Sequence, residues 1–139
     1  MKKVISALIT SFCLTIGFQA NAEVAVIVAA DSAASATPAE ISRIFLGKLK
    51  KFGDGSKVEV VYGKEGTNTR TEFDKKALGK SPSQIKAYWS KLLFSGKGSP
   101  PKELASDAEI KAKVAAGGGA IGYIDAAAVD GTVKVLTTY

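Results

Sequence analysis

Three helix-start signals, placed between short apolar runs, constrain the fold of this chain more than any other feature of its sequence. They are TPAE at residues 37–40, SPSQ at 81–84 and SDAE at 106–109. In each, a hydroxyl side chain can cap the first turn of a helix while a Glu or Gln three residues later reaches back to the cap. Proline in the first turn of the first two suits the same position. The pattern predicts helices that begin at these three points.

The runs between these signals are typical of short strands. They are apolar or rich in β-branched residues, and they lie at 23–30, 58–62, 120–124 and 133–138. A short alanine-rich turn or helix is expected between the last two, at 125–129. Strands that alternate with capped helices predict an α/β domain with a small, mostly parallel or mixed sheet flanked by helices.

The expected helices carry their apolar residues at helical spacing, which predicts the faces that are buried. The helix after residue 84 has the most regular pattern: Ile85, Tyr88, Trp89, Leu92 and Leu93. We therefore expect Trp89 to belong to the core rather than to a ligand site. The other helices are expected to point Ile41, Ile44, Phe45, Phe73, Ala77, Leu78, Ile110 and Val114 inward.

The first 22 residues read as a secretory signal peptide. Lys2 and Lys3 precede an uncharged apolar run, and Ala20-Asn21-Ala22 supplies the small residues that a signal peptidase requires. The run is shorter than the roughly 20 residues of a membrane anchor. We expect cleavage after Ala22, so that residues 23–139 form a single periplasmic domain with no membrane anchor.

Composition excludes several classes of function. The chain has no histidine, and its single cysteine lies in the expected signal peptide. The exported domain therefore lacks disulfides, thiol nucleophiles, the usual zinc ligands and the imidazole base of most acid–base catalysis. We predict no enzyme activity, no cofactor and no metal site. The net charge of +6 favours anionic partners, but the basic residues form no stripe that indicates nucleic acid.

Two glycine-rich segments resemble nucleotide-binding motifs without meeting their requirements. GGGAIG at 117–122 follows an expected helix and enters an expected strand, which inverts the order of a dinucleotide-binding motif. Gly96-Lys97 lacks the earlier glycine and the following Ser or Thr of a phosphate-binding P-loop. Both segments are interpreted as turns.

The segment KEGTNTRTEF at 64–73 is the candidate binding site. It lies between an expected strand and an expected helix. The first turn of a helix exposes unpaired N–H groups and a partial positive charge, and anions bind there readily. Thr67 and Thr69 offer hydroxyls, and Asn68 and Thr69 offer amides. The alternative, which remains open on these residues, is that Thr67 or Asn68 only caps the helix.

The whole exported domain resembles a known family. The segments that carry the resemblance are IFLGK at 44–48, the run at 58–73, AYWSKLLFSGKGSPPKEL at 87–104, and AIGY at 120–123. The chain is similar to the second lobe of phosphate-binding proteins of bacterial ABC transporters, and especially to short, secreted, single-lobe relatives. The resemblance implies one lobe of the type-2 periplasmic binding protein fold, with phosphate or a related oxyanion as the ligand.

The resemblance also implies which residues bind. Full-length members use a segment of the form Arg-x-x-Gly-Ser-Gly-Thr before a helix. Carried over, its Ser falls on Thr67, its second Gly on Asn68 and its Thr on Thr69. The Arg falls on Gly63, so the strongest contact with an oxyanion is missing, and Lys64 and Arg70 are the nearby cations that could replace it.

Two hypotheses follow from these observations. In the first, the chain is a solute-binding domain that holds phosphate or a similar oxyanion with Thr67, Asn68, Thr69 and Arg70. In the second, the fold is retained, the ligand site is vestigial, and the domain contacts a membrane transporter or another periplasmic protein. The absence of the Arg and of a second lobe favours the second hypothesis, whereas the resemblance to the family favours the first.

Overall fold

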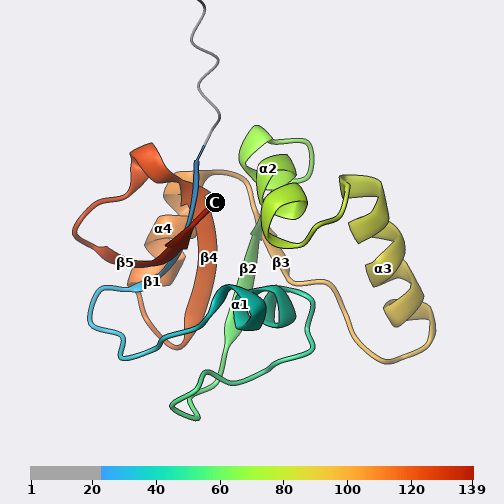
Figure 1. Ribbon diagram of the computed structural model, residues 1–139, viewed down its shortest axis with the longest axis horizontal. Helices are drawn as coiled ribbons and strands as arrows, with labels where there is room; N and C mark the ends of the chain where they lie inside the picture. Colours follow the sequence, from blue (N-terminus) through green and yellow to red (C-terminus); the bar gives the residue numbers. More distant parts are fainter. Residues whose placement is uncertain (1–22) are drawn as a thin grey trace, which may run out of the picture.

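The computed structural model describes residues 23–139, and the expected signal peptide lies outside them. Strands and helices are interleaved along the chain, as the sequence predicts, with α2 and α3 in succession (Figure 1). The elements are β1 (Val24–Ala29), α1 (Pro38–Phe45), β2 (Glu59–Gly63), α2 (Asn68–Ala77), α3 (Pro82–Phe94), β3 (Lys102–Leu104), α4 (Asp107–Ala115), β4 (Ala120–Asp125), the 3-10 helix η1 (Ala126–Ala128) and β5 (Val133–Thr138).

The five strands form one mixed sheet in the order β3-β2-β4-β1-β5. Strand β2 pairs in parallel with β3 and β4, whereas β1 pairs antiparallel with β4 and β5. The predicted fold class is therefore confirmed. Strand β3 was not predicted, because its three residues are largely exposed and have no apolar alternation.

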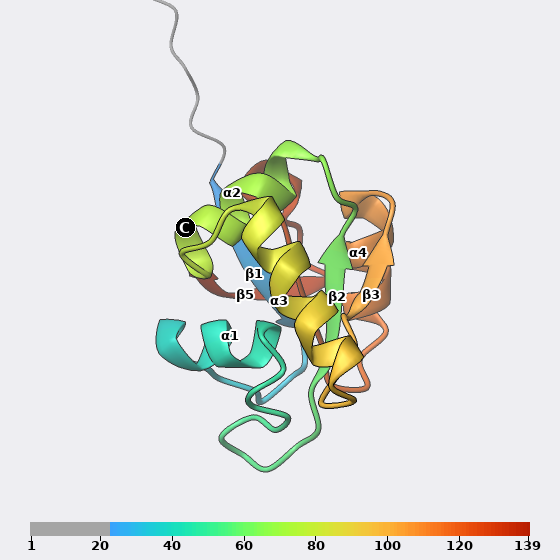
Figure 2. The ribbon, with the colours of Figure 1, turned by 90° about the vertical axis from the view of Figure 1, so that its right-hand side faces the viewer.

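Both faces of the sheet are covered. Figure 2 shows α1, α2 and α3 on one side of β2 and α4 on the other. Strand β1 contributes to both layers: Val24, Val26 and Val28 join the cluster under α1–α3, while Ala25 and Ile27 join the cluster under α4. Burial on both faces explains why β1 is apolar throughout instead of alternating.

Two of the three predicted capping boxes are complete. The side chains of Thr37 and Ser81 each accept a hydrogen bond from the amide three residues later. In return, the side chains of Glu40 and Gln84 accept from the amides of Thr37 and Ser81. At α4, Ser106 Oγ accepts from the Glu109 amide at 3.2 Å, but Glu109 Oε2 accepts from the Ala105 amide at 2.9 Å, one residue before the cap. The helix begins where predicted, but only the hydrogen bond from the Glu109 amide to Ser106 Oγ belongs to a capping box.

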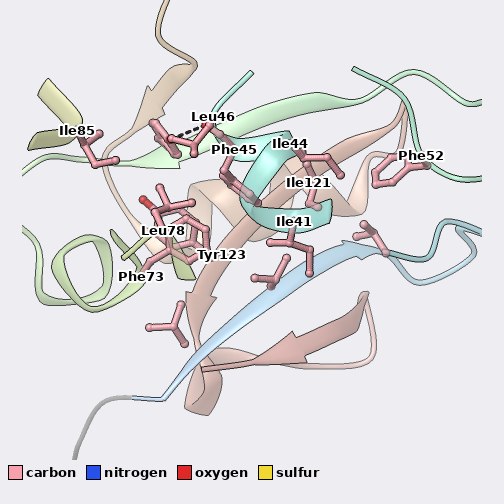
Figure 3. Close-up of a cluster of buried hydrophobic side chains, with 14 of the residues drawn as sticks. Ile41, Ile44, Phe45, Leu46, Phe52, Phe73, Leu78, Ile85, Ile121 and Tyr123 are labelled. Carbon is pink, nitrogen blue, oxygen red and sulfur yellow. Dashed lines mark hydrogen bonds between the residues drawn. The ribbon is translucent and has the colours of Figure 1, made fainter. Parts of the chain in front are cut away.

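An aromatic cluster fills the centre of the larger core (Figure 3). The rings of Phe73 and Tyr123 stack with their centres 3.9 Å apart, and Phe45 meets Phe73 edge-on at 4.7 Å. Tyr62 lies beside Phe45, and its hydroxyl donates to the Phe45 carbonyl at 2.7 Å. The cluster joins α1 and α2 to β2 and β4, so it fixes the position of the junction between β2 and α2.

The predicted burial of α3 is correct for Ile85 and Trp89 and wrong for Leu93. Trp89 is 6% exposed, as expected for a core residue, whereas Leu93 is 58% exposed and the neighbouring Phe94 is 95% exposed. Helix α3 lies at the edge of the molecule (Figure 1), so only a narrow stripe of it contacts the domain. Helical spacing predicted a wider buried face than this position allows.

No helix within residues 23–139 has the length and hydropathy required to cross a membrane.

Candidate functional site

The junction between β2 and α2 is held from both sides. The Gly63 amide donates to Tyr123 Oη at 3.0 Å, and the Lys64 amide donates to the Leu104 carbonyl of β3 at 3.0 Å. Gly66 has a φ of +88°, which a residue with a side chain rarely adopts, and it turns the chain into the helix. The first turn of α2 is therefore presented on a fixed loop.

Thr67 is the N-cap of α2. Its Oγ1 accepts from the Arg70 amide at 3.3 Å and donates to the Lys64 carbonyl at 3.0 Å. A hydroxyl has one hydrogen to donate, so in this arrangement Thr67 organises the turn. Its hydroxyl would have to rotate away from Lys64 to donate to an anion.

Asn68 and Thr69 are the first two residues of α2, where backbone amides have no intrahelical acceptor. The Asn68 side chain is exposed and Thr69 is partly exposed. Within residues 23–139 we find no hydrogen bond to the Thr69 hydroxyl. These two amides and this hydroxyl are the donors that the helix start offers to solvent.

Arg70 points into the protein instead. It is 6% exposed. Its Nη1 donates to the Gly63 carbonyl at 2.8 Å and to Glu103 Oε1 at 3.1 Å. Its Nε donates to Asp74 Oδ2 at 3.0 Å, and its Cζ lies 4.4 Å from the centre of the Tyr62 ring. The guanidinium thus ties α2 to β2 and β3.

Asp74 is the most deeply buried charged group of this network, with no exposed surface. Burial raises the pKa of its carboxyl, and the charge of Arg70 acts in the opposite direction. The i,i+4 spacing of Arg70 and Asp74 is visible in the sequence and is the signal by which this pair could be found. Glu103 could not be found that way, because it comes from the unpredicted strand β3.

Gly63, where the resemblance expects an arginine, is buried. A Cβ placed there would lie 3.5 Å from the Tyr123 ring and 3.7 Å from Ile110 Cδ1, which are ordinary contact distances. The direction of that Cβ is toward Tyr123 and Ile110.

The structure places the four predicted site residues in two groups. Thr67, Asn68 and Thr69 lie at the start of α2, and Arg70 is turned into the protein.

Comparisons with known proteins support the fold. No protein family model and no curated protein sequence matches the chain. Solved structures do match: a protein from Clostridium perfringens described as a phosphate ABC transporter substrate-binding protein with bound phosphate (21% identity, TM-score 0.66), and an ABC-type phosphate transport receptor from Vibrio cholerae (20% identity, TM-score 0.63). PstS from Borrelia burgdorferi is also similar, at 12% identity and a TM-score of 0.56.

The chain spans a little under half the length of these structures. In each comparison 84% of this chain is covered, against 45%, 46% and 47% of the other chain. The likeness shows a common fold. This domain corresponds to a single lobe of the periplasmic binding protein fold.

Proposed function

We propose that this protein is a periplasmic solute-binding domain that holds phosphate or a similar oxyanion at the start of α2. The anion would accept hydrogen bonds from the Asn68 and Thr69 amides and from the Thr69 hydroxyl. Thr67 would shape the turn, and Arg70 would contribute through its hold on the Gly63 carbonyl. No chemistry and no cofactor belong to this proposal.

The observation that carries the proposal is the start of α2 within a lobe of this fold. The similar protein from Clostridium perfringens is described with bound phosphate. In the present chain the β2–α2 junction is fixed by Tyr123 and β3, and it presents free donors at a helix N-terminus, where the helix dipole also favours an anion.

The proposal predicts weak binding. A guanidinium gives the strongest contact with an oxyanion, and Arg70 is engaged with Asp74, Glu103 and the Gly63 carbonyl. A single lobe also leaves the ligand in contact with water, which competes for its hydrogen bonds. We expect a dissociation constant of about 1 mM, equivalent to about −4 kcal/mol.

Amide resonances of ¹⁵N-labelled protein, recorded during a titration with inorganic phosphate, test where the anion binds. The proposal predicts saturable shifts centred on Asn68 and Thr69, with smaller shifts at Gly66 and Thr67. A matched titration with chloride at equal ionic strength is the control. Shifts confined to other parts of the surface, or equal shifts with chloride, would contradict the proposal.

A second candidate function is a periplasmic interaction module with a vestigial ligand site. The observation that favours it is the pair of large apolar side chains at the end of α3, with Leu93 58% and Phe94 95% exposed. Exposed aromatic residues often anchor protein interfaces. This candidate predicts no phosphate-dependent shifts and a membrane transporter or periplasmic protein as the partner, whose binding is lost in Phe94→Ala.

A further inference from the structure

A groove with a volume of about 710 Å³ lies between the end of α1, the start of β2 and helix α3. Its volume falls in the range of roughly 300–1,000 Å³ that is usual for small-molecule sites. Its lining residues Lys57, Val58 and Val60 lie at the start of β2. Helix α2 follows the other end of that strand (Figure 1). From Val60 at the groove, three more strand residues, spanning roughly 10 Å, lead to the loop before α2.

The walls of the groove are apolar and fixed. Its apolar lining residues include Ile44, Val58, Val60, Tyr88, Trp89 and Leu92. The Tyr88 hydroxyl donates to the Leu46 carbonyl at 2.7 Å, which ties α3 to the end of α1. Gly47, with a φ of +72°, allows the Trp89 ring to approach the chain, because a Cβ there would lie 3.1 Å from Trp89 Cη2.

The rim of the groove has one sign of charge. Four lysines line it, and no acidic residue does: Lys48, Lys50, Lys57 and Lys97. All four are exposed, and none forms an ion pair within residues 23–139. Nearby Glu59 does not neutralise them, because its Oε1 pairs with Lys113 Nζ at 3.0 Å.

An apolar floor with a cationic rim matches a ligand that combines both properties. A small inorganic anion would use the lysines and leave the floor wet, and a neutral hydrocarbon would leave four unpaired charges around it. We propose that this groove binds an amphiphilic anion, with its hydrocarbon body against Trp89 and Leu92 and its acidic head group at the lysine rim. This site is separate from the start of α2 and does not depend on phosphate binding there.

The fluorescence of Trp89 provides the measurement, because it is the only tryptophan of the chain and, although its side chain belongs mostly to the core, it also lines the groove. The purified protein is titrated with dodecanoate below the concentration at which it forms micelles. The proposal predicts a saturable change in emission. Decanoate, with two fewer methylene groups to bury, should bind about fifteenfold more weakly. Dodecyltrimethylammonium, with the same tail and the opposite charge, should produce no saturable change.

Matched lysine variants test the rim. Lys48→Gln combined with Lys57→Gln should weaken dodecanoate binding about tenfold, since an exposed ion pair contributes up to about fivefold. Lys91→Gln is the control: Lys91 is an exposed lysine on α3, the helix that carries Trp89, but it does not line the groove. All three positions are exposed, so the fold is expected to persist, and circular dichroism checks this.

Several results would overturn the proposal: no saturable change with dodecanoate, equal binding of the cationic amphiphile, or a double lysine variant that behaves like Lys91→Gln. An excess of inorganic phosphate should leave dodecanoate binding unchanged apart from the general effect of salt, which an equal ionic strength of sodium chloride measures. Specific competition by phosphate would contradict the separation of the two sites. Failure of phosphate to bind at the start of α2 would leave the groove proposal unaffected.

Discussion

Arg70 and Asp74, one turn apart on α2, form a buried ion pair in which Arg70 Nε lies 3.0 Å from Asp74 Oδ2, with 8% and 0% of the two side chains exposed. Arg70 was a candidate ligand on sequence grounds, because it is one of two nearby cations that could replace the arginine missing at Gly63. In the folded protein its charge is surrounded by Asp74, Glu103 and the Gly63 carbonyl. We assign it the role of holding the β2–α2 junction.

Removal of one member of this pair should be costly. Asp74→Ala leaves the guanidinium of Arg70 buried without its main partner, and we expect the free energy of unfolding to fall by about 3 kcal/mol or more. Glu72→Ala is the matched control, because Glu72 and Lys76 form an i,i+4 pair on the same helix, 3.2 Å apart and about 30% exposed. That change should cost less than about 1 kcal/mol. Equal losses in urea denaturation would argue against a structural role for the Arg70–Asp74 pair.

Two residues of α3 should differ sharply in their effect on stability. Trp89→Ala removes a side chain that is 6% exposed and should cost about 3–5 kcal/mol. Leu93→Ala, on the same helix at 58% exposure, should change stability by no more than about 0.5 kcal/mol. Thermal or urea unfolding of the two variants measures this difference in stability. Similar losses for both would show that Leu93 is packed in solution.

Gly122 is required for the approach of α4 to the sheet. A Cβ at this position would lie 2.7 Å from Ile110 Cγ2 and 3.1 Å from Val61 Cγ2. We expect Gly122→Ala to destabilise the protein by about 1–3 kcal/mol through overpacking. Gly131→Ala is the control, because a Cβ there meets nothing within 4 Å. A Gly122→Ala protein as stable as Gly131→Ala would mean that α4 is not seated as described.

Asp130 should make stability depend on pH in the acid range. Its Oδ2 lies 2.8 Å from Lys111 Nζ, and this contact, with the hydrogen bonds from Thr132, holds its pKa well below the usual range. The contribution is present above the ordinary Asp pKa of about 3.9 and is lost as the pH falls toward the lowered value in the folded protein. The melting temperature of Asp130→Asn should therefore be lower than that of the wild type at pH 7, by an amount that shrinks toward pH 3. A constant difference would contradict this.

Signals contained within a few residues predicted their part of the structure well. The capping boxes at Thr37 and Ser81 depend only on side chains three positions apart, and they mark the starts of α1 and α3 correctly. The GGGAIG segment was also interpreted correctly as a turn, because the neighbouring residues alone indicate a helix before it and a strand at its end. Strand β1 was recognisable because burial on both faces leaves an uninterrupted apolar run.

Features that depend on distant parts of the chain were not predictable in this way. The contact of Arg70 with Glu103 joins residues 33 positions apart, and Glu103 lies on a strand of three residues. The exposure of Leu93 reflects the place of α3 at the edge of the domain, which helical periodicity does not encode. The lysine-rimmed groove collects residues from α1, β2, α3 and two loops, so no segment of the sequence indicates it.

Isothermal titration of the purified protein with inorganic phosphate at low ionic strength measures whether the start of α2 binds an oxyanion. Such a site predicts a saturable heat with a dissociation constant of about 1 mM and binding that weakens as salt is added. Thr69→Val, which keeps the shape of the side chain and removes its hydroxyl, should abolish this heat without loss of fold, whereas Lys48→Gln with Lys57→Gln should leave it largely intact. No heat beyond dilution from the wild type, or undiminished binding by Thr69→Val, would contradict an oxyanion site at the start of α2.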